Sequence, residues 1–301
     1  MPDGPPAAVL AAFGAGRHQV TGLSDVPDGN ANWLISGDSG PLVLRRHHAE
    51  ATPAGLTWEH TVLRHLARAG WTVPEPVGEL TGYQGHWYGL NRYVPGQPAR
   101  PEGPGEQAQR GRTLARLHVA LRELGDRIGP RPGWRPQHTH TTVLTGLDWD
   151  ASVRALAASS PRLAGWAAAA AASARDALDA AGANALPVTV VHGDFADWNM
   201  HYTGGRLTGV IDFELAHLDS RPFELAMARA YRAPAAAAAY RAELDRLGWP
   251  LSQLEESVAE PVYRAVRVGL AAWPMEQGRR TGRFDRGAIE RQLSRSGTPP
   301  P

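Results

Sequence analysis

The first third of the chain alternates short apolar runs with turn-forming residues, a pattern typical of β-strands. Residues 32–35 and 42–44 are apolar, partly β-branched runs separated by the turn sequence Ser-Gly-Asp-Ser-Gly, which predicts a hairpin. Residues 56–69 place apolar side chains at helical spacing after a Thr-Pro pair and before a glycine, which predicts one helix. Two further strands are expected at about residues 77–80 and 87–94.

The remainder of the chain has a mainly helical pattern. Leucines recur at helical spacing in residues 106–124, and the alanine-rich stretch 151–181 favours one or two helices. Two β-branched runs, 188–191 and 207–213, interrupt this pattern and predict strands. Three more helices are expected at about residues 222–231, 235–247 and 254–272, followed by a frayed tail from residue 294.

A stretch rich in Pro, Gly and Arg follows residue 94 and separates the two patterns. We therefore expect an α+β protein with two lobes. Residues 1–94 would form a lobe with an antiparallel sheet and one helix, and residues 95–301 a mostly helical lobe.

Composition fits a globular protein and excludes several functional classes. The chain has 301 residues with 43% hydrophobic and 20% charged side chains, so neither a disordered nor a collagen-like protein is expected. A net charge of +1 provides no electrostatic footprint for nucleic acid or an anionic membrane. The absence of Cys excludes disulfides, thiolate metal sites and thiol nucleophiles.

Two further features bear on location and chemistry. The first sixteen residues lack a basic segment followed by an uninterrupted apolar run, and no charge-free apolar stretch approaches membrane-spanning length, so we expect a soluble, cytoplasmic protein. All 31 basic residues are Arg. Any role that a lysine ammonium fills in other proteins must therefore be filled here by a guanidinium.

The most informative segment runs from residue 190 to residue 217, VVHGDFADWNMHYTGGRLTGVIDFELAH. It contains Asp194, Asn199 five residues later, and Asp212 at the end of an apolar run. Phosphoryl transfer needs such a set, because one carboxylate orients the attacking hydroxyl while an amide oxygen and a second carboxylate hold Mg²⁺ against the nucleotide phosphates. An isolated Asp-x-x-x-x-Asn is common, so the interpretation depends on the combination.

That combination, HGD-x-x-x-x-N followed by a strand ending in I-D-F-E, closely resembles the aminoglycoside phosphotransferase and choline kinase-like family, small-molecule relatives of protein kinases. The resemblance covers about residues 20–275 and implies a protein-kinase-like fold that uses ATP and Mg²⁺. It implies Asp194 as the catalytic base or hydroxyl orienter, and Asn199 and Asp212 as the metal ligands. Glu214, often acidic in the family, would support the metal or the loop.

Other landmarks implied by the resemblance lie upstream in the expected order. Arg45 stands where the family places the basic residue that clamps the nucleotide phosphates, and Glu59 matches its acidic partner. The segment before this strand, with Asn32, resembles the phosphate-covering loop. Asn91 and Tyr93 fall in the segment that resembles the interlobe hinge, whose backbone would hydrogen-bond adenine.

Several other polar residues have structural interpretations. His118 is expected to be a packed core residue, and His192 to support the catalytic loop. Histidine pairs at 47–48 and 138–140 lack a third ligand at a diagnostic spacing, so no metal site is expected there. For Arg221, Arg229 and Arg232, surface ion pairs are favoured over contacts to an anionic acceptor.

The identity of the acceptor is left open by the sequence. The partner is a hydroxylated small molecule, either an antibiotic or a metabolite, and the oligomeric state cannot be deduced. A nucleotide-binding pseudoenzyme or regulatory protein with the same fold is the alternative, disfavoured because Asp194, Asn199 and Asp212 are all present. A protein kinase is disfavoured because the A-P-E sequence is absent.

Overall fold

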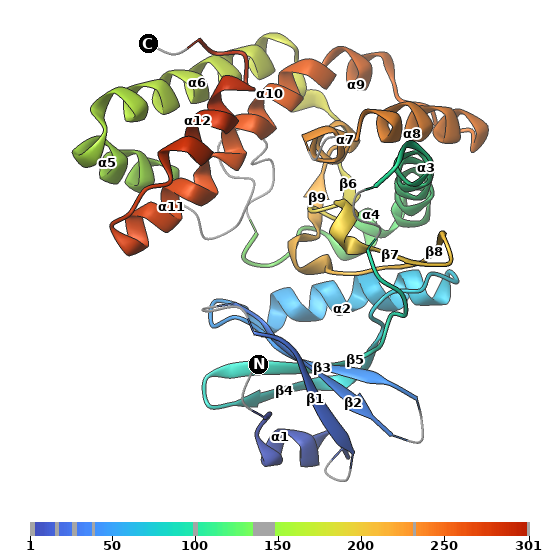
Figure 1. Cartoon of the computed structure of the whole chain (residues 1–301). Coiled ribbons are helices and arrows are strands. Elements are labelled where there is room, and N and C mark those ends of the chain that lie inside the picture. Colours follow the sequence, from blue (N-terminus) through green and yellow to red (C-terminus); the bar gives the residue numbers. More distant parts are fainter. Residues whose placement is uncertain are drawn as a thin grey trace. The chain divides into compact units, whose positions relative to one another are not determined.

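The computed structural model describes residues 4–15, 18–25, 29–37, 40–98, 102–134, 148–230 and 233–299. The chain divides into two compact units. Figure 1 labels the helices and strands that belong to them. The first unit comprises Met1–Arg100 and two later segments, Arg131–Gly133 and Trp198–Glu214. The second comprises Pro101–Pro130, Trp134–Asp197 and Leu215–Pro301. Two segments from the C-terminal two thirds of the sequence therefore belong to the same unit as the N-terminal sheet.

The first unit is built on a five-stranded antiparallel sheet with the order β1-β2-β3-β5-β4. Its strands are β1 (Gln19–Asp25), β2 (Ala31–Ser36), β3 (Leu42–Arg46), β4 (Pro76–Tyr83) and β5 (His86–Arg92). The predicted hairpin is confirmed, because β2 and β3 pair in a register that places Trp33 opposite Leu44. Strand β1 was not predicted: its sequence, QVTGLSD, mixes polar residues and glycine and has no continuous apolar run.

Two helices lie on opposite sides of this sheet, α1 (Ala7–Ala12) and α2 (Pro53–Arg68) (Figure 1). The predicted helix is confirmed in α2, which begins with Thr52 accepting a hydrogen bond from the backbone N–H of Gly55 at 3.1 Å. Its buried face carries Leu56, Val62 and Leu66, as the sequence spacing indicates. The same face also buries Glu59, which must find a partner in the core.

The hairpin of β7 (Met200–Thr203) and β8 (Arg206–Val210) also belongs to the first unit. Its turn uses Gly204 and Gly205, both with positive φ. The strand predicted at 207–213 ends earlier, at Val210. Asp212 adopts a positive φ of 67° and Phe213 begins a short 3₁₀ turn, so the backbone leaves the extended conformation there.

The second unit is mostly helical, in agreement with the predicted fold class. Its helices are α3 (Pro104–Leu121), α4 (Leu124–Ile128), α5 (Trp149–Ser159), α6 (Pro161–Ala180), α7 (Arg221–Ala230), α8 (Pro234–Arg246), α9 (Gln253–Ser257), α10 (Ala259–Leu270), α11 (Ala272–Thr281) and α12 (Arg286–Ser294). Two short strands, β6 (Thr189–Val191) and β9 (His217–Asp219), pair antiparallel. The helix predicted at 254–272 is interrupted at Val258, and α12 was not predicted.

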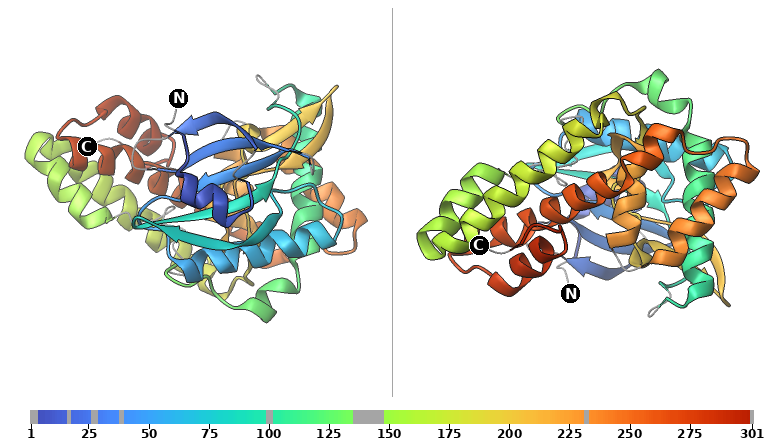
Figure 2. Two further views of the ribbon diagram at one scale, coloured as in Figure 1. Left: turned by 90° about the horizontal axis from the view of Figure 1, so that it is seen from below. Right: turned by 90° about the horizontal axis from the view of Figure 1, so that it is seen from above.

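A large apolar cluster holds the helices of this unit together. Alanines of α6 pack against valines of α10 and against Ile289 and Leu293 of α12, and Figure 2 shows these three helices side by side. Small alanine side chains let the helices approach closely. Elsewhere in this unit α3 packs along α8. None of the helices in the described ranges is both long and apolar enough to cross a membrane.

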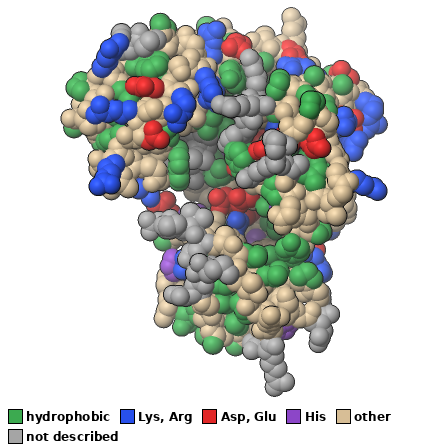
Figure 3. Space-filling model, in the orientation of Figure 1, with side chains coloured by type: hydrophobic (Ala, Val, Ile, Leu, Met, Phe, Trp, Pro, Cys, Tyr) green, Lys and Arg blue, Asp and Glu red, His purple; other side chains and the backbone are tan. Residues whose placement is uncertain are grey.

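Basic and acidic side chains both occur on the face of the helical unit that Figure 3 shows. In the view of Figure 3, Arg side chains are interspersed with Asp and Glu over the helical unit. This agrees with the net charge of +1.

Candidate active site

The predicted metal ligands Asn199 and Asp212 stand at the open end of the β7–β8 hairpin. Met200 pairs with Val210, and the backbone N–H of Ile211 donates to the carbonyl oxygen of Asn199 at 3.0 Å. Asn199 itself accepts this last hydrogen bond, and Asp212 directly follows its donor, Ile211. The two residues therefore stand at the ends of the two strands. The hairpin thus brings together two residues that are thirteen positions apart in the sequence.

Asp212 occupies an unusual backbone conformation. Its φ of 67° lies in the left-handed region, which non-glycine residues seldom adopt although Asp tolerates it better than most. Its side chain is 31% exposed, so the carboxylate can reach a ligand. Backbone strain of this kind concentrates at functional sites, which agrees with the role predicted for Asp212.

Arg45 on β3 forms an ion pair with Asp212. Its Nη2 lies 2.9 Å from Asp212 Oδ1, and its Nε donates to Asn32 Oδ1 at 3.2 Å from the neighbouring strand β2. Burial alone lowers the pKa of Arg45, but the carboxylates of Asp212, Glu214 and Glu59 outweigh it and raise the pKa above its ordinary value. The guanidinium therefore stays charged.

The structure gives Glu59 a different partner from the one that the resemblance implied. Its Oε2 lies 3.0 Å from Nη2 of Arg131, whereas the ion pair of Arg45 is with Asp212. Glu59 still lies close enough to contribute to the raised pKa of Arg45. Sequence reasoning missed Arg131, because it lies 72 residues from Glu59 in a connector without periodicity.

Glu214 follows Asp212 in the 3₁₀ turn and faces Asn30. The Asn30 side-chain amide donates to Glu214 Oε2, and the backbone N–H of His48 donates to Asn30 Oδ1 at 3.0 Å. Burial raises the pKa of Glu214 to about 7, and the negative charge of Asp212 adds to this rise. Asn30 thus links the turn after β8 to the loop after β3.

In the second unit, the loop carrying Asp194 follows strand β6. Gly193 has a φ of 83°, and a Cβ at this position would stand 2.1 Å from the carbonyl oxygen of Leu215. Only glycine fits such a site. The backbone N–H of Asp194 donates to Nδ1 of the buried His192 at 3.3 Å, which agrees with the supporting role expected for His192.

Glu224 of α7 anchors this loop. Its fully buried Oε2 accepts the backbone N–H groups of His192 and Gly193, the latter at 3.1 Å. Burial raises the pKa of Glu224 to about 7, although the backbone donors favour its ionised form. Sequence reasoning missed this residue, which is 32 positions from His192.

A second anchor holds the other side of the loop. Arg110 of α3 is almost completely buried, pairs with Glu102 at 3.0 Å and donates from Nη1 to the carbonyl oxygen of Phe195 at 3.0 Å. Glu224 on α7 therefore holds the two residues before Asp194, and Arg110 on α3 holds the residue after it. Such support fixes a catalytic side chain more tightly than a free loop does.

The two predicted adenine-binding residues lie at the end of β5. Asn91 is buried and pairs with Val43 and Pro76 of the neighbouring strands. The backbone N–H of Tyr93 donates to the carbonyl oxygen of Pro41 at 3.2 Å. The contact of these two residues with a nucleotide stays a prediction.

The remaining polar residues have mixed outcomes. His118 is fully buried and its Nδ1 lies 2.7 Å from the Tyr240 hydroxyl, which confirms a packed core residue. Arg221 forms an ion pair with Glu255 at 2.7 Å, as predicted, but both side chains are buried and do not lie at the surface. The side chain of Arg229 and all of His138, His140 and Arg232 lie outside the described residues.

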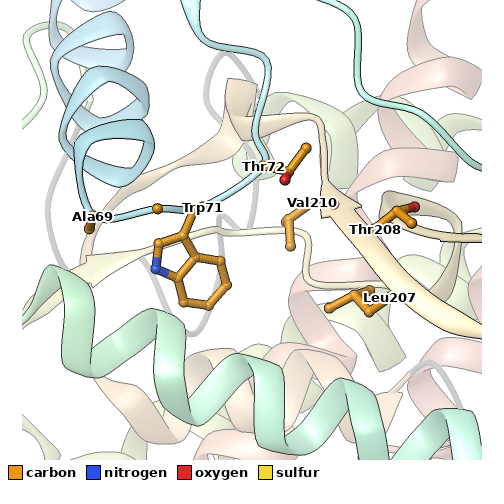
Figure 4. Close-up of a pocket in the computed structure, with 8 residues that line it drawn as sticks. Ala69, Trp71, Thr72, Leu207, Thr208 and Val210 are labelled. Carbon is orange, nitrogen blue, oxygen red and sulfur yellow. The ribbon is translucent and has the colours of Figure 1, made fainter.

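One small cavity of about 180 Å³ lies in the first unit. It is lined by residues between the end of α2 and strand β8, including Trp71, Thr72 and Thr208, and Figure 4 shows the Trp71 ring at its edge. None of the predicted site residues lines it. Its volume is below the roughly 300 Å³ typical of small-molecule sites.

The donor chemistry of the hairpin fits Mg²⁺. A carboxylate and an amide oxygen are hard ligands, and Mg²⁺ bound to a nucleotide takes few protein ligands because phosphates and water fill its other positions. Within the described ranges no three His, Asp or Glu side chains gather as a metal-binding cluster. The pair Asn199 and Asp212 therefore suits a metal that arrives with a nucleotide, not a metal held entirely by protein.

Comparison with known proteins decides the family. Residues 23–260 match the model of the phosphotransferase enzyme family. The chain belongs to this family. Among curated proteins, it is similar to the homoserine kinases of Xanthobacter autotrophicus (26% identity over 73% of this chain) and Rhodospirillum rubrum (30% over 66%). The matched regions span 66% and 60% of those two proteins, less than two thirds of either.

Solved structures of phosphotransferases share the fold. An aminoglycoside phosphotransferase from Alicyclobacillus acidocaldarius superposes with a TM-score of 0.66 at 19% identity, covering 99% of this chain and 93% of that one. A microcompartment-associated aminopropanol kinase gives a TM-score of 0.61 at 16% identity, covering 96% and 94%. The predicted two-lobed, kinase-like fold class is thereby confirmed for this chain.

Proposed function

We propose that this phosphotransferase moves the γ-phosphoryl group of ATP to a hydroxyl group of a small molecule. The observation that carries the proposal is the Arg45–Asp212 ion pair at the end of the hairpin that also presents Asn199. It combines a fixed positive charge, suited to nucleotide phosphates, with two hard oxygen ligands. Relatives solved in complex with ADP and with AMP-PNP support nucleotide use, and ATP as donor fits the cytoplasmic location expected above.

In this proposal Asp194 orients the acceptor hydroxyl and takes its proton. Asp194 and Asn199 are five positions apart in the sequence, so their Cα atoms are at most about 18 Å apart even in a fully extended chain. The anchors Glu224 and Arg110 hold the loop on both sides of Asp194, which suits a residue that must stay aligned with its substrate. Asn199 and Asp212 would hold Mg²⁺, which neutralises phosphate charge when bound.

Arg45 would act on the phosphates as a charged clamp. Because Asn32 holds Nε and Asp212 holds Nη2, its planar guanidinium is fixed in direction. We also keep Asn91 and Tyr93 as proposed neighbours of the adenine ring, on the resemblance to the hinge alone. Catalysis would then depend mainly on positioning and electrostatics.

Two acceptor classes have support from relatives. The curated relatives are named homoserine kinases, which favours a small amino acid that carries a hydroxyl group. Fold relatives include an aminoglycoside phosphotransferase solved with hygromycin B, but that likeness concerns the fold alone. The 31 Arg residues balance the 30 Asp and Glu residues, so no excess of acidic charge in the chain favours a polycationic antibiotic. We therefore place a hydroxy amino acid of the homoserine type first.

The test is a Mg²⁺-dependent ATP turnover assay with homoserine and other hydroxy amino acids, amino alcohols, aminoglycosides, other hydroxylated antibiotics and sugars as acceptors. The proposal expects one acceptor class to stimulate ADP release at least 100-fold over water, with a phosphorylated product detected by mass spectrometry. Nucleotide binding without turnover for every acceptor would instead support a pseudoenzyme with this fold. An absence of Mg²⁺-nucleotide binding would overturn both.

A further inference from the structure

Glu59 needs a cationic partner, and its position in the fold explains why. The residue lies on the buried face of α2 and is only 4% exposed. A buried carboxylate without a paired charge is costly. Arg45 is engaged with Asp212 and Asn32, and the chain contains no lysine. The partner that the structure provides is Arg131, with 3.0 Å between Nη2 and Glu59 Oε2.

Arg131 also reaches the turn that carries Asp212. Its Nη1 donates to the backbone carbonyl oxygen of Glu214 at 2.7 Å, and its side chain is 10% exposed. The guanidinium lies 5.9 Å from the centre of the Trp58 ring, within reach of a cation–π contact. A single side chain thus joins helix α2 to the backbone two residues after Asp212.

The neighbouring backbone follows the same course. The carbonyl oxygen of Pro132 would stand 3.3 Å from a Cβ on Gly55, so the connector runs close against the first turn of α2. Arg131–Gly133 accordingly belongs to the first unit, although the residues before and after it belong to the second. The fork of a guanidinium suits this place, because it donates in two directions at once whereas an ammonium acts as a point charge.

We propose that Arg131 is a positioning residue for the metal–nucleotide side of the site: by tying Glu59 and the Glu214 carbonyl together, it fixes the turn that presents Asp212. The acidic residue on α2 and the basic residue on β3 are then each held by a different partner. This inference rests on the proposed function, because it assigns Arg131 an effect on the binding of a Mg²⁺-nucleotide.

The test measures metal binding directly, apart from turnover. Mg²⁺ is titrated calorimetrically into wild-type protein saturated with ADP, and into Arg131→Met, Arg131→Lys and the control Arg127→Met, whose side chain is exposed on α4. Residues that orient a metal ligand change metal affinity by about 10- to 100-fold when replaced. We expect that loss in Arg131→Met, a smaller loss in Arg131→Lys, and no change in Arg127→Met.

A double-mutant cycle with Glu59→Gln isolates the pair. If Arg131 acts through Glu59, the double variant loses less Mg²⁺ affinity than the product of the two single losses. A loss of Mg²⁺ affinity in the double variant equal to the product of the two single losses would overturn the role of the Arg131–Glu59 pair. If Arg131→Met does not fold, as thermal unfolding will show, Arg131→Lys and Glu59→Gln provide the same comparison.

The outcomes separate this inference from the proposed function. Wild-type protein that binds no Mg²⁺–ADP would overturn the proposed function itself. Wild-type protein that binds it, together with an Arg131→Met variant of equal Mg²⁺ affinity and normal thermal stability, would overturn only the positioning role of Arg131.

Discussion

Arg45 and Asp212 are joined by an ion pair of 2.9 Å although 167 residues separate them in the sequence. The pair connects the third strand of the sheet to the turn after β8. Each partner has a further support. Arg45 donates a hydrogen bond to Asn32, and Arg131 donates one to the Glu214 carbonyl oxygen in the turn that follows Asp212. A positive charge and the carboxylate proposed to bind Mg²⁺ are thereby fixed side by side before any substrate is considered.

The first prediction concerns Arg45. In the proposed function, replacing it by Met would remove a charge-assisted contact to the nucleotide phosphates, worth about 1.5–3 kcal/mol, so the KM for ATP should rise about 10- to 100-fold. Arg45→Lys should have a smaller effect, because the ammonium keeps the charge but loses the second donor that contacts Asn32. Steady-state kinetics at varied ATP measure this. An unchanged KM for ATP in Arg45→Met would remove Arg45 from the nucleotide site.

The second prediction concerns Glu224, which anchors the loop that carries Asp194. Glu224→Ala leaves the backbone N–H groups of His192 and Gly193 without their buried acceptor. We expect the free energy of unfolding to fall by about 3 kcal/mol and kcat to fall with it, whereas Glu224→Gln, which keeps one acceptor oxygen, should lose less. Urea denaturation and kinetics report the two effects.

The matched control for the anchor is Glu290→Ala, because Glu290 is exposed on α12. It should leave both the stability and kcat unchanged. A Glu224→Ala variant as stable and active as this control would show that the catalytic loop does not need its anchor.

The third prediction is a pH dependence of stability that arises from His118. Burial lowers the pKa of His118 to about 3, with the positive charge of Arg221 adding to the shift, against an ordinary value of 6.5. Protonation therefore favours the unfolded chain. The stability contributed by the neutral imidazole is fully present above pH 6.5 and is lost as the pH falls toward 3, at about 1.4 kcal/mol per pH unit.

The variant His118→Gln has no titratable group there and should lose less stability on acidification. Unfolding free energies at pH 7, 5.5 and 4.5, compared between the two proteins, measure the difference in slope. Burial also lowers the pKa of His60 to about 4, so part of the wild-type slope will persist in the variant. Parallel curves for the two proteins would show that His118 titrates alike in the folded and unfolded chains.

The features that the sequence predicted correctly are local ones. The β2–β3 hairpin and helix α2 follow from alternation, a threonine cap and a turn, all contained within about twenty residues. The positive φ of Gly193 likewise fits a glycine between His192 and Asp194. The end of β8 was misplaced because the apolar run Val210-Ile211 continues beyond the point where Asp212 turns the backbone.

The features that sequence reasoning missed are pairings between distant segments. Arg131 with Glu59, Arg110 with the Phe195 carbonyl and Glu224 with the catalytic loop join residues 72, 85 and 32 positions apart. No spacing rule connects such residues, since their proximity depends on how whole elements pack. The sequence thus provided candidate site residues, whose roles stay predictions, but it did not indicate most of the side chains that contact them.

The most direct test of the account is a single-turnover measurement of phosphoryl transfer from ATP and Mg²⁺ to the best acceptor, in wild-type protein and in Asp194→Asn. We predict that Asp194→Asn binds nucleotide as wild type does but transfers the phosphoryl group about 10²- to 10⁴-fold more slowly, while Asp176→Asn, exposed on α6, transfers normally. Transfer by Asp194→Asn at the wild-type rate would contradict the proposed mechanism.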